Sequence, residues 1–213
     1  MSIKMLLKRL ADMVFPYIPR CVSCGVEKGV DAYLCAGCAA DMQKRRAGAS
    51  GAGAYPAFSA YRYDGPVARL VRRYKYGGDK WLCACMADAM AAVIDMAGVD
   101  AVCHVPLHGK RRRSRGFDQA EALAKRLAAQ SGRPFVGALR RVRNTRTQTR
   151  LNARQRQDNM RGAFESVGPV SGRLVLVDDV LTTGATAAEC AAVLTAAGAQ
   201  SVTVLTFAQA VKG

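Results

Sequence analysis

The stretch from Leu174 to Thr186 limits the possible folds more than any other part of the sequence. It begins with four apolar residues, two of them β-branched, which is typical of a strand buried on both faces of a parallel sheet. Asp178 and Asp179 follow, then a short loop of hydroxyl residues and glycine, and then a helix expected at residues 187–197. This order predicts an α/β fold with a ligand site at the carboxyl end of the strand.

The loop after the acidic pair carries groups that suit a phosphorylated pentose. Backbone N–H groups and the positive end of the following helix favour a phosphate. Three threonines add hydroxyl donors, and Gly184 lets the backbone approach the ligand closely. The two carboxylates are placed to accept hydrogen bonds from ribose hydroxyls. A buried strand followed by a capped helix is the structural alternative.

This stretch resembles the phosphoribosyl-pyrophosphate (PRPP) motif of type I phosphoribosyltransferases. It is not a Walker loop, because no Gly-Lys-Ser/Thr follows the glycine. It is not the dinucleotide-binding fingerprint either, because the acidic pair precedes the loop. The expected phosphoribosyl-binding residues are Asp178, Asp179, Thr182, Thr183, Gly184, Ala185 and Thr186.

Strand and helix patterns alternate from Tyr55 onward, which predicts a doubly wound α/β domain with a mainly parallel sheet. The expected strands are 55–63, 99–105, 135–139, 174–177 and 202–207. The expected helices are 67–76, 80–97, 118–130 and 187–197. No apolar run reaches the roughly 18 residues that a membrane span needs, so no span is expected.

Two Cys-x2-Cys pairs near the amino terminus predict a structural zinc site with ligands Cys21, Cys24, Cys35 and Cys38. A disulfide framework is the alternative, and it is disfavoured because no secretion signal is recognisable; a reducing, cytoplasmic compartment is expected. Residues 1–46 are predicted to form an amphipathic helix and this module. The Ala/Gly/Ser-rich residues 47–54 predict a flexible linker, and residues 55–213 the main domain.

Positive charge is concentrated in one quarter of the chain. The formal net charge is +16, and residues 108–161 hold 16 Lys or Arg against three Asp or Glu. Such a segment attracts phosphates, which indicates a polyphosphate substrate, a nucleic acid or both, unless it is only a solvated basic face. The polar residues 140–161 are expected to form a mobile loop and short helix that closes over the site or lies on DNA phosphates. The residues expected to do so are Arg143, Arg146, Thr147, Gln148, Arg150 and Arg154.

An arginine-rich loop is expected after Pro106, at the same sheet edge as the acidic pair, and is the candidate pyrophosphate clamp. The chain has two histidines. His104 is expected to be a core residue, whereas a core or a functional role remains open for His108. No Ser or Cys partner for nucleophilic catalysis is evident.

Several motifs in order resemble the ComF family of competence-associated proteins. They are the paired cysteines, Tyr74-Lys75-Tyr76-Gly77-Gly78, Val105-Pro106 with Arg113-Ser114-Arg115-Gly116-Phe117-Asp118-Gln119-Ala120, Arg146-Thr147-Gln148 with Asn159 and Gly162-Ala163-Phe164, and the stretch 177–186. The chain departs from the family pattern in having Asp118 where Asn is usual, and in lacking a further cysteine pair before the main domain.

The resemblance implies a type I phosphoribosyltransferase fold and a role in moving transforming single-stranded DNA into the cytoplasm, which makes DNA-uptake proteins plausible partners. It also implies that Lys75, Arg113 and Arg115 face the pyrophosphate of PRPP, with magnesium. Three functions stay open: a phosphoribosyl-transfer enzyme with an unidentified acceptor, a DNA-handling protein that kept the nucleotide site, and a PRPP sensor without catalysis. Phosphoribosyl transfer needs held phosphates and exclusion of water more than a strong acid or base.

Overall fold

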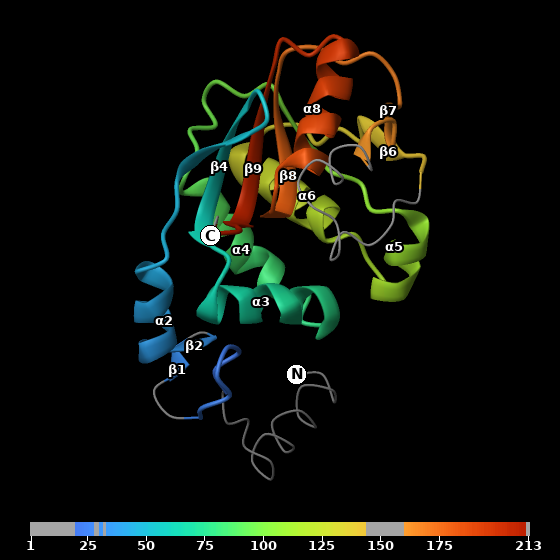
Figure 1. Ribbon diagram of the computed structural model, residues 1–213. Coiled ribbons are helices and arrows are strands. Elements are labelled where there is room, and N and C mark those ends of the chain that lie inside the picture. Colours follow the sequence, from blue (N-terminus) through green and yellow to red (C-terminus); the bar gives the residue numbers. More distant parts are fainter. Residues whose placement is uncertain (1–19, 28–29, 32, 144–159, 212–213) are drawn as a thin grey trace, which may run out of the picture.

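The computed structural model describes residues 20–27, 30–31, 33–143 and 160–211, and its centre is a five-stranded sheet in the order β3-β4-β9-β8-β5 (Figure 1). The four strands from β4 to β5 are parallel, and only the edge strand β3 runs antiparallel to its neighbour. The fold is therefore α/β with a mainly parallel sheet, as predicted. The strands are β3 (Ala49–Ala52), β4 (Tyr55–Arg62), β5 (Ala101–His104), β8 (Arg173–Leu181) and β9 (Ser201–Gln209).

Helices cover both faces of the sheet because alternate residues of its central strands point to opposite sides. Val175 and Val177 of β8 belong to the core on the side of α6, whereas Leu174 and Leu176 belong to the core on the side of α8; α4 packs against the neighbouring strand β9. Among the described helices none is long and apolar enough to cross a bilayer. The helices around the sheet are α3 (Gly65–Tyr76), α4 (Leu82–Ala91), α5 (Gly109–Arg115), α6 (Gln119–Ser131) and α8 (Ala185–Ala196).

The structure corrects three predicted elements of the main domain. The expected helix 80–97 is only α4, and the arginine-rich segment after Pro106 is helix α5 rather than a loop. Arginine is a good helix former, so this segment becomes helical without an apolar stripe. The expected strand 135–139 is replaced by an isolated bridge at Phe135 and by β6 (Leu139–Arg141), which pairs antiparallel with β7 (Phe164–Ser166).

The segment expected to be a flexible linker contributes strand β3 to the main sheet. Ala49 to Ala52 pair with Tyr55 to Phe58 of β4, and Ala52 is fully buried. Ala52 also packs closely against the expected phosphate loop, because a Cβ added at Gly184 would lie only 3.1 Å from the Cα of Ala52. The flexible-linker prediction is therefore wrong for residues 49–52, which pair with β4 despite their Gly/Ala composition.

The four-cysteine module, residues 20–43, packs against α3 below the sheet (Figure 1). Its elements are β1 (Val30–Asp31), β2 (Leu34–Cys35) and α2 (Ala36–Gln43). Arg69 of α3 donates from Nε to Ser23 Oγ at 2.9 Å, and Leu34 and Met42 are buried in the same core as Leu70. The amino-terminal helix expected before Arg20 lies outside the described residues.

Candidate functional site

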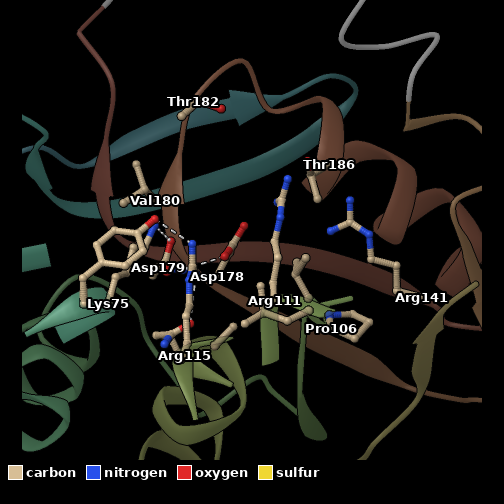
Figure 2. A pocket seen from close by; sticks show the side chains of 15 residues that line it. Lys75, Pro106, Arg111, Arg115, Arg141, Asp178, Asp179, Val180, Thr182 and Thr186 are labelled. Carbon is tan, nitrogen blue, oxygen red and sulfur yellow. Dashed lines mark hydrogen bonds and ion pairs between the residues drawn. The ribbon is translucent and has the colours of Figure 1, made fainter. Parts of the chain in front are cut away.

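A cavity of about 350 Å³ opens at the carboxyl edge of the sheet, where β5 and β8 end (Figure 2). We call it the edge cavity. It is lined by Lys75, Tyr76, Val105, Pro106, Leu107, Arg111, Arg115, Gln119, Ala120, Arg141, Asp178, Asp179, Val180, Thr182 and Thr186. Four cationic side chains and two carboxylates thus surround one space, a charge balance that favours an anionic ligand carrying hydroxyl groups.

The acidic pair lies inside strand β8 rather than after it, and its second member forms an ion pair. Lys75 Nζ lies 2.7 Å from Asp179 Oδ1, and both side chains are largely buried. Burial alone would lower the pKa of Lys75, but the charge of Asp179, the hydrogen bond that it accepts from Lys75 and the charge of Asp178 together raise the pKa. Burial, and then the charge of Asp179, raises the pKa of Asp178 to about 7. The cavity therefore holds one aspartate paired with Lys75 and, next to it, a second aspartate that takes up a proton more readily than an ordinary aspartate.

This raised pKa predicts a pH-dependent stability. The ordinary pKa of the Asp178 carboxyl is 3.8, so between pH 4 and 7 the folded protein holds a proton that the unfolded chain has released. Stability from this group is present at low pH and lost as pH rises towards 7. We expect the free energy of unfolding of Asp178→Asn, relative to that of the wild type, to increase as pH rises from about 4 to about 7. Urea unfolding of both proteins measures this difference. A constant difference between the two across this range would contradict the raised pKa of the Asp178 carboxyl.

Two neighbouring side chains fix the position of Arg115 at the wall of the cavity. Its guanidinium donates to Gln119 Oε1 at 3.0 Å and to the Tyr76 hydroxyl at 2.9 Å. It also lies 4.9 Å from the centre of the Tyr76 ring. An arginine fixed in this way loses little freedom when it binds an anion, so the predicted role of Arg115 in holding pyrophosphate fits its position.

Arg113 does not line the edge cavity, although it was predicted to face pyrophosphate. In helix α5, Arg111 and Arg115 are four residues apart and share a face, whereas Arg113 lies between them in sequence and points elsewhere. Arg111 takes the place expected for Arg113. A segment expected to be a loop has no regular faces, so its sequence does not predict which of its arginines point into the cavity.

Arg141 is a second lining residue that the sequence analysis missed. It lies at the end of β6, and Figure 2 shows it on the side of the cavity where Thr186 lies. Burial, followed by the positive charge of Arg111, lowers the pKa of Arg141. Two guanidinium groups close enough to repel each other would both be stabilised by an anion between them.

The short loop 182–184 leads directly into α8, whose first residues are Ala185 and Thr186. Gly184 precedes the helix with φ of +78°, a conformation that favours glycine. Thr182 and Thr186 line the edge cavity, whereas Thr183 lines a second cavity of about 340 Å³. Gly184 and Ala185 supply backbone at the beginning of the helix and line neither cavity, so their predicted contact with a phosphate rests on backbone N–H groups.

Asp118 stabilises the wall of the cavity that is formed by the segment after Pro106 and the beginning of α6. Its carboxylate accepts from the Leu107 N–H at 2.8 Å and from the Glu121 N–H at 3.2 Å, so it caps α6 and fixes the segment after Pro106. His104 is buried and its ring stacks on Phe135, which confirms the predicted core role. His108 precedes α5 and is not among the lining residues.

The four cysteines of the amino-terminal module come together as predicted. Their sulfur atoms all lie within 4.8 Å of one another, and the Cys24 and Cys35 sulfurs are 3.7 Å apart. Four ligands at the usual Zn–S distance of about 2.3 Å stand roughly 3.8 Å apart in a tetrahedron. None of the eight cysteines forms a disulfide, and Gly25 turns the first pair so that its N–H bonds to the Cys21 carbonyl. The cluster fits a structural metal ion.

Of the six residues predicted to form a basic loop, only Arg143 belongs to the described part of the chain. It follows β6 and is exposed. The other five, from Arg146 to Arg154, lie outside the described residues, so their role stays a prediction.

Comparison with known proteins found no matching family model. The chain is 37% identical over 151 residues to a DNA utilization protein, YhgH, of Salmonella typhi, covering 67% of this chain and 66% of the relative. It is 31% identical over 160 residues to Competence protein F of Haemophilus influenzae, covering 70% of each. A YhgH protein of Escherichia coli is 42% identical over 107 residues, covering 49% of this chain and 47% of the relative. The matches with the first two span about two thirds of the length of those relatives.

Proposed function

Because this chain belongs to the ComF family, we propose that it binds PRPP or another 5′-phosphorylated ribose in the edge cavity and acts in DNA uptake by handling single-stranded DNA. The names of its relatives, a competence protein and DNA utilization proteins, support the role in DNA uptake. DNA-uptake proteins are then its expected partners.

The observation that carries PRPP binding is the arrangement of charge around the edge cavity. Thr182, Thr186 and the beginning of α8 suit a 5′-phosphate, and Asp178 and Asp179 suit the ribose hydroxyls. Lys75, Arg111 and Arg115 suit a pyrophosphate on the other side of the sugar, whereas Arg141 adds positive charge on the side of Thr186. PRPP has these three parts in this order, so one ligand accounts for the two carboxylates and the cations together.

Bound ions extend this proposal. We propose zinc at the four cysteines, where it would tie the two halves of the module together, and a cytoplasmic location, in keeping with eight cysteines that form no disulfide. Magnesium would supply positive charge to the pyrophosphate of PRPP. We propose that it enters with the ligand, because Lys75 already neutralises Asp179 in the cavity.

The same cavity would serve transfer of the phosphoribosyl group, since such a reaction depends on held phosphates and excluded water. Pyrophosphate release measured with purine, pyrimidine and nicotinate acceptors separates a transferase from a PRPP sensor. Single-stranded DNA binding is supported by the basic residues 108–161, and its affinity should then fall steeply as salt rises.

Two arginines of the same helix provide a matched test of PRPP binding. We expect Arg115→Ala to weaken PRPP binding about 10- to 100-fold, since one hydrogen-bonded charged contact contributes about 1.5–3 kcal/mol. Arg113→Ala should bind PRPP nearly as well as the wild type, because Arg113 does not line the cavity. Isothermal titration calorimetry with PRPP, and with ribose 5-phosphate and pyrophosphate separately, gives the affinities. Equal losses in both variants would contradict the site, and no binding of any of the three ligands by the wild type would refute the proposal.

A further inference from the structure

Two exposed aromatic side chains flank the connection between α3 and α4. Among described residues, Tyr76 and Trp81 are the only aromatics in the set of exposed large hydrophobic side chains, with 70% and 53% of their surfaces accessible. The other members of that set are valines. Large aromatic rings gain much from burial, so two such rings on one exposed turn indicate a surface that a partner covers.

Both rings are held in place by polar contacts. Trp81 donates from Nε1 to Asp79 Oδ1 at 3.1 Å, and Asp79 accepts from Arg73 Nε at 2.6 Å. The Arg115 guanidinium lies over the Tyr76 ring in the cation–π contact described above. Fixed rings present their faces without the loss of freedom that loose side chains would suffer on binding, so this turn is prepared for stacking.

Positive charge is interleaved with the two rings. Arg72, Arg73 and Lys80 are exposed beside them, and Lys80 Nζ lies 5.2 Å from the centre of the Phe117 ring. The single acidic residue of the turn, Asp79, is already paired with Arg73. Aromatic rings that stack on bases, between cations that face phosphates, are the pattern of single-stranded nucleic acid binding. The two rings favour a single strand over a duplex as the occupant, because base pairs inside a duplex expose no faces to stack on.

The surface links the two sites already described. At one end the Trp81 ring meets Tyr33 of the four-cysteine module edge-on at 6.0 Å, and Arg73 donates to the Val22 carbonyl at 3.4 Å. At the other end Tyr76 lines the edge cavity. Figure 1 shows α3 between the four-cysteine module and the sheet, so this route runs along the end of α3.

We propose that residues 72–81 with Arg115 form a platform for single-stranded DNA, on which bases stack against Trp81 and Tyr76 while the strand runs from the four-cysteine module to the edge cavity. This inference rests on the proposed function, since it assigns a surface to the DNA that the protein handles. It differs from the sequence-based expectation, which placed DNA on residues 143–154, a segment without aromatic residues.

Trp81 is the only tryptophan of the chain, so its fluorescence reports directly on this surface. Titration of the full-length protein with oligothymidylate is expected to quench the fluorescence. An oligomer of the same length with abasic sites should bind without that quenching, because it offers phosphates but no bases. Fluorescence anisotropy of labelled oligothymidylate should show affinity falling about tenfold in Trp81→Ala, which corresponds to one lost stacked base. The slope of affinity against salt should be unchanged, because no phosphate contact is lost.

Controls distinguish this inference from the function on which it rests. Trp81→Phe should keep most of the affinity, and Val167→Ala, which shortens an exposed hydrophobic side chain elsewhere, should keep all of it. PRPP binding should be unchanged in Trp81→Ala, which also shows that the variant is folded. The platform would be overturned if the wild type bound DNA without quenching and Trp81→Ala bound it with wild-type affinity. The proposed function would still stand in that case. Failure of the wild type to bind single-stranded DNA at low salt would overturn both the platform and the proposed DNA handling, and would leave the proposed PRPP binding to its own test.

Discussion

Lys75→Met is expected to destabilise the fold by about 3–5 kcal/mol at neutral pH, because it leaves the largely buried Asp179 carboxylate without its partner. Removing Lys75 also removes a positive charge that lowers the pKa of Asp178. The Asp178 carboxyl of this variant should therefore have a higher pKa and protonate more easily than in the wild type, and the deficit should shrink as pH falls. Urea unfolding of both proteins at acidic, neutral and mildly alkaline pH measures the free energy of unfolding.

The double variant Lys75→Met with Asp179→Asn separates stability from binding. It removes both charges, so most of the lost stability should return, whereas PRPP affinity should stay low because the pyrophosphate has lost a cationic partner. Calorimetry with PRPP and urea unfolding on the two single variants and the double variant complete the cycle. If Lys75→Met were as stable as the wild type, or if the double variant recovered PRPP binding, the ion pair would not have the role assigned to it.

The parts of the site that were predictable from sequence depend on local chemistry. The apolar run before Asp178, the glycine at 184 and the threonines around it are adjacent in the chain, so strand, loop and helix follow from one short stretch. Lys75 was placed at the site by its motif, and the ion pair with Asp179 confirms that the two segments meet. The four cysteines came together for the same reason, since their spacing alone suits one metal ion.

The parts that were missed depend on pairing between distant segments. Arg141 reaches the cavity from β6, whose partner β7 is more than 20 residues away along the chain. Strand β3 has a composition typical of linkers, and only its pairing with β4 makes it part of the sheet. Arg113 was expected at the pyrophosphate because it stands in the motif that resembles the ComF family. A run of arginines has no apolar periodicity from which to predict that Arg111 shares the cavity-facing side of the helix with Arg115.

Gly184→Ala is expected to weaken PRPP binding at least 100-fold, the largest effect of any single methyl group that we predict for this chain. The new Cβ would lie 3.1 Å from the Cα of Ala52, a backbone atom of β3 that cannot turn aside, so the phosphate loop must shift. The φ of +78° adds a strain of about 1–2 kcal/mol for a residue other than glycine. A displaced loop loses several N–H contacts to the phosphate together, and each tenfold loss of affinity corresponds to about 1.4 kcal/mol. Calorimetry with PRPP and thermal unfolding of the same samples measure affinity and stability.

Gly132→Ala is the matched control for backbone strain. Gly132 ends α6 with φ of +66°, and a Cβ added there would meet nothing within 4 Å. The control should therefore lose about 1–2 kcal/mol of stability from strain alone and bind PRPP as the wild type does. A loss of PRPP affinity in Gly132→Ala equal to that in Gly184→Ala would show that reduced stability, not the position of the loop, governs binding. Full PRPP affinity in Gly184→Ala would place the phosphate away from this loop, because a ligand held by its N–H groups cannot tolerate their displacement.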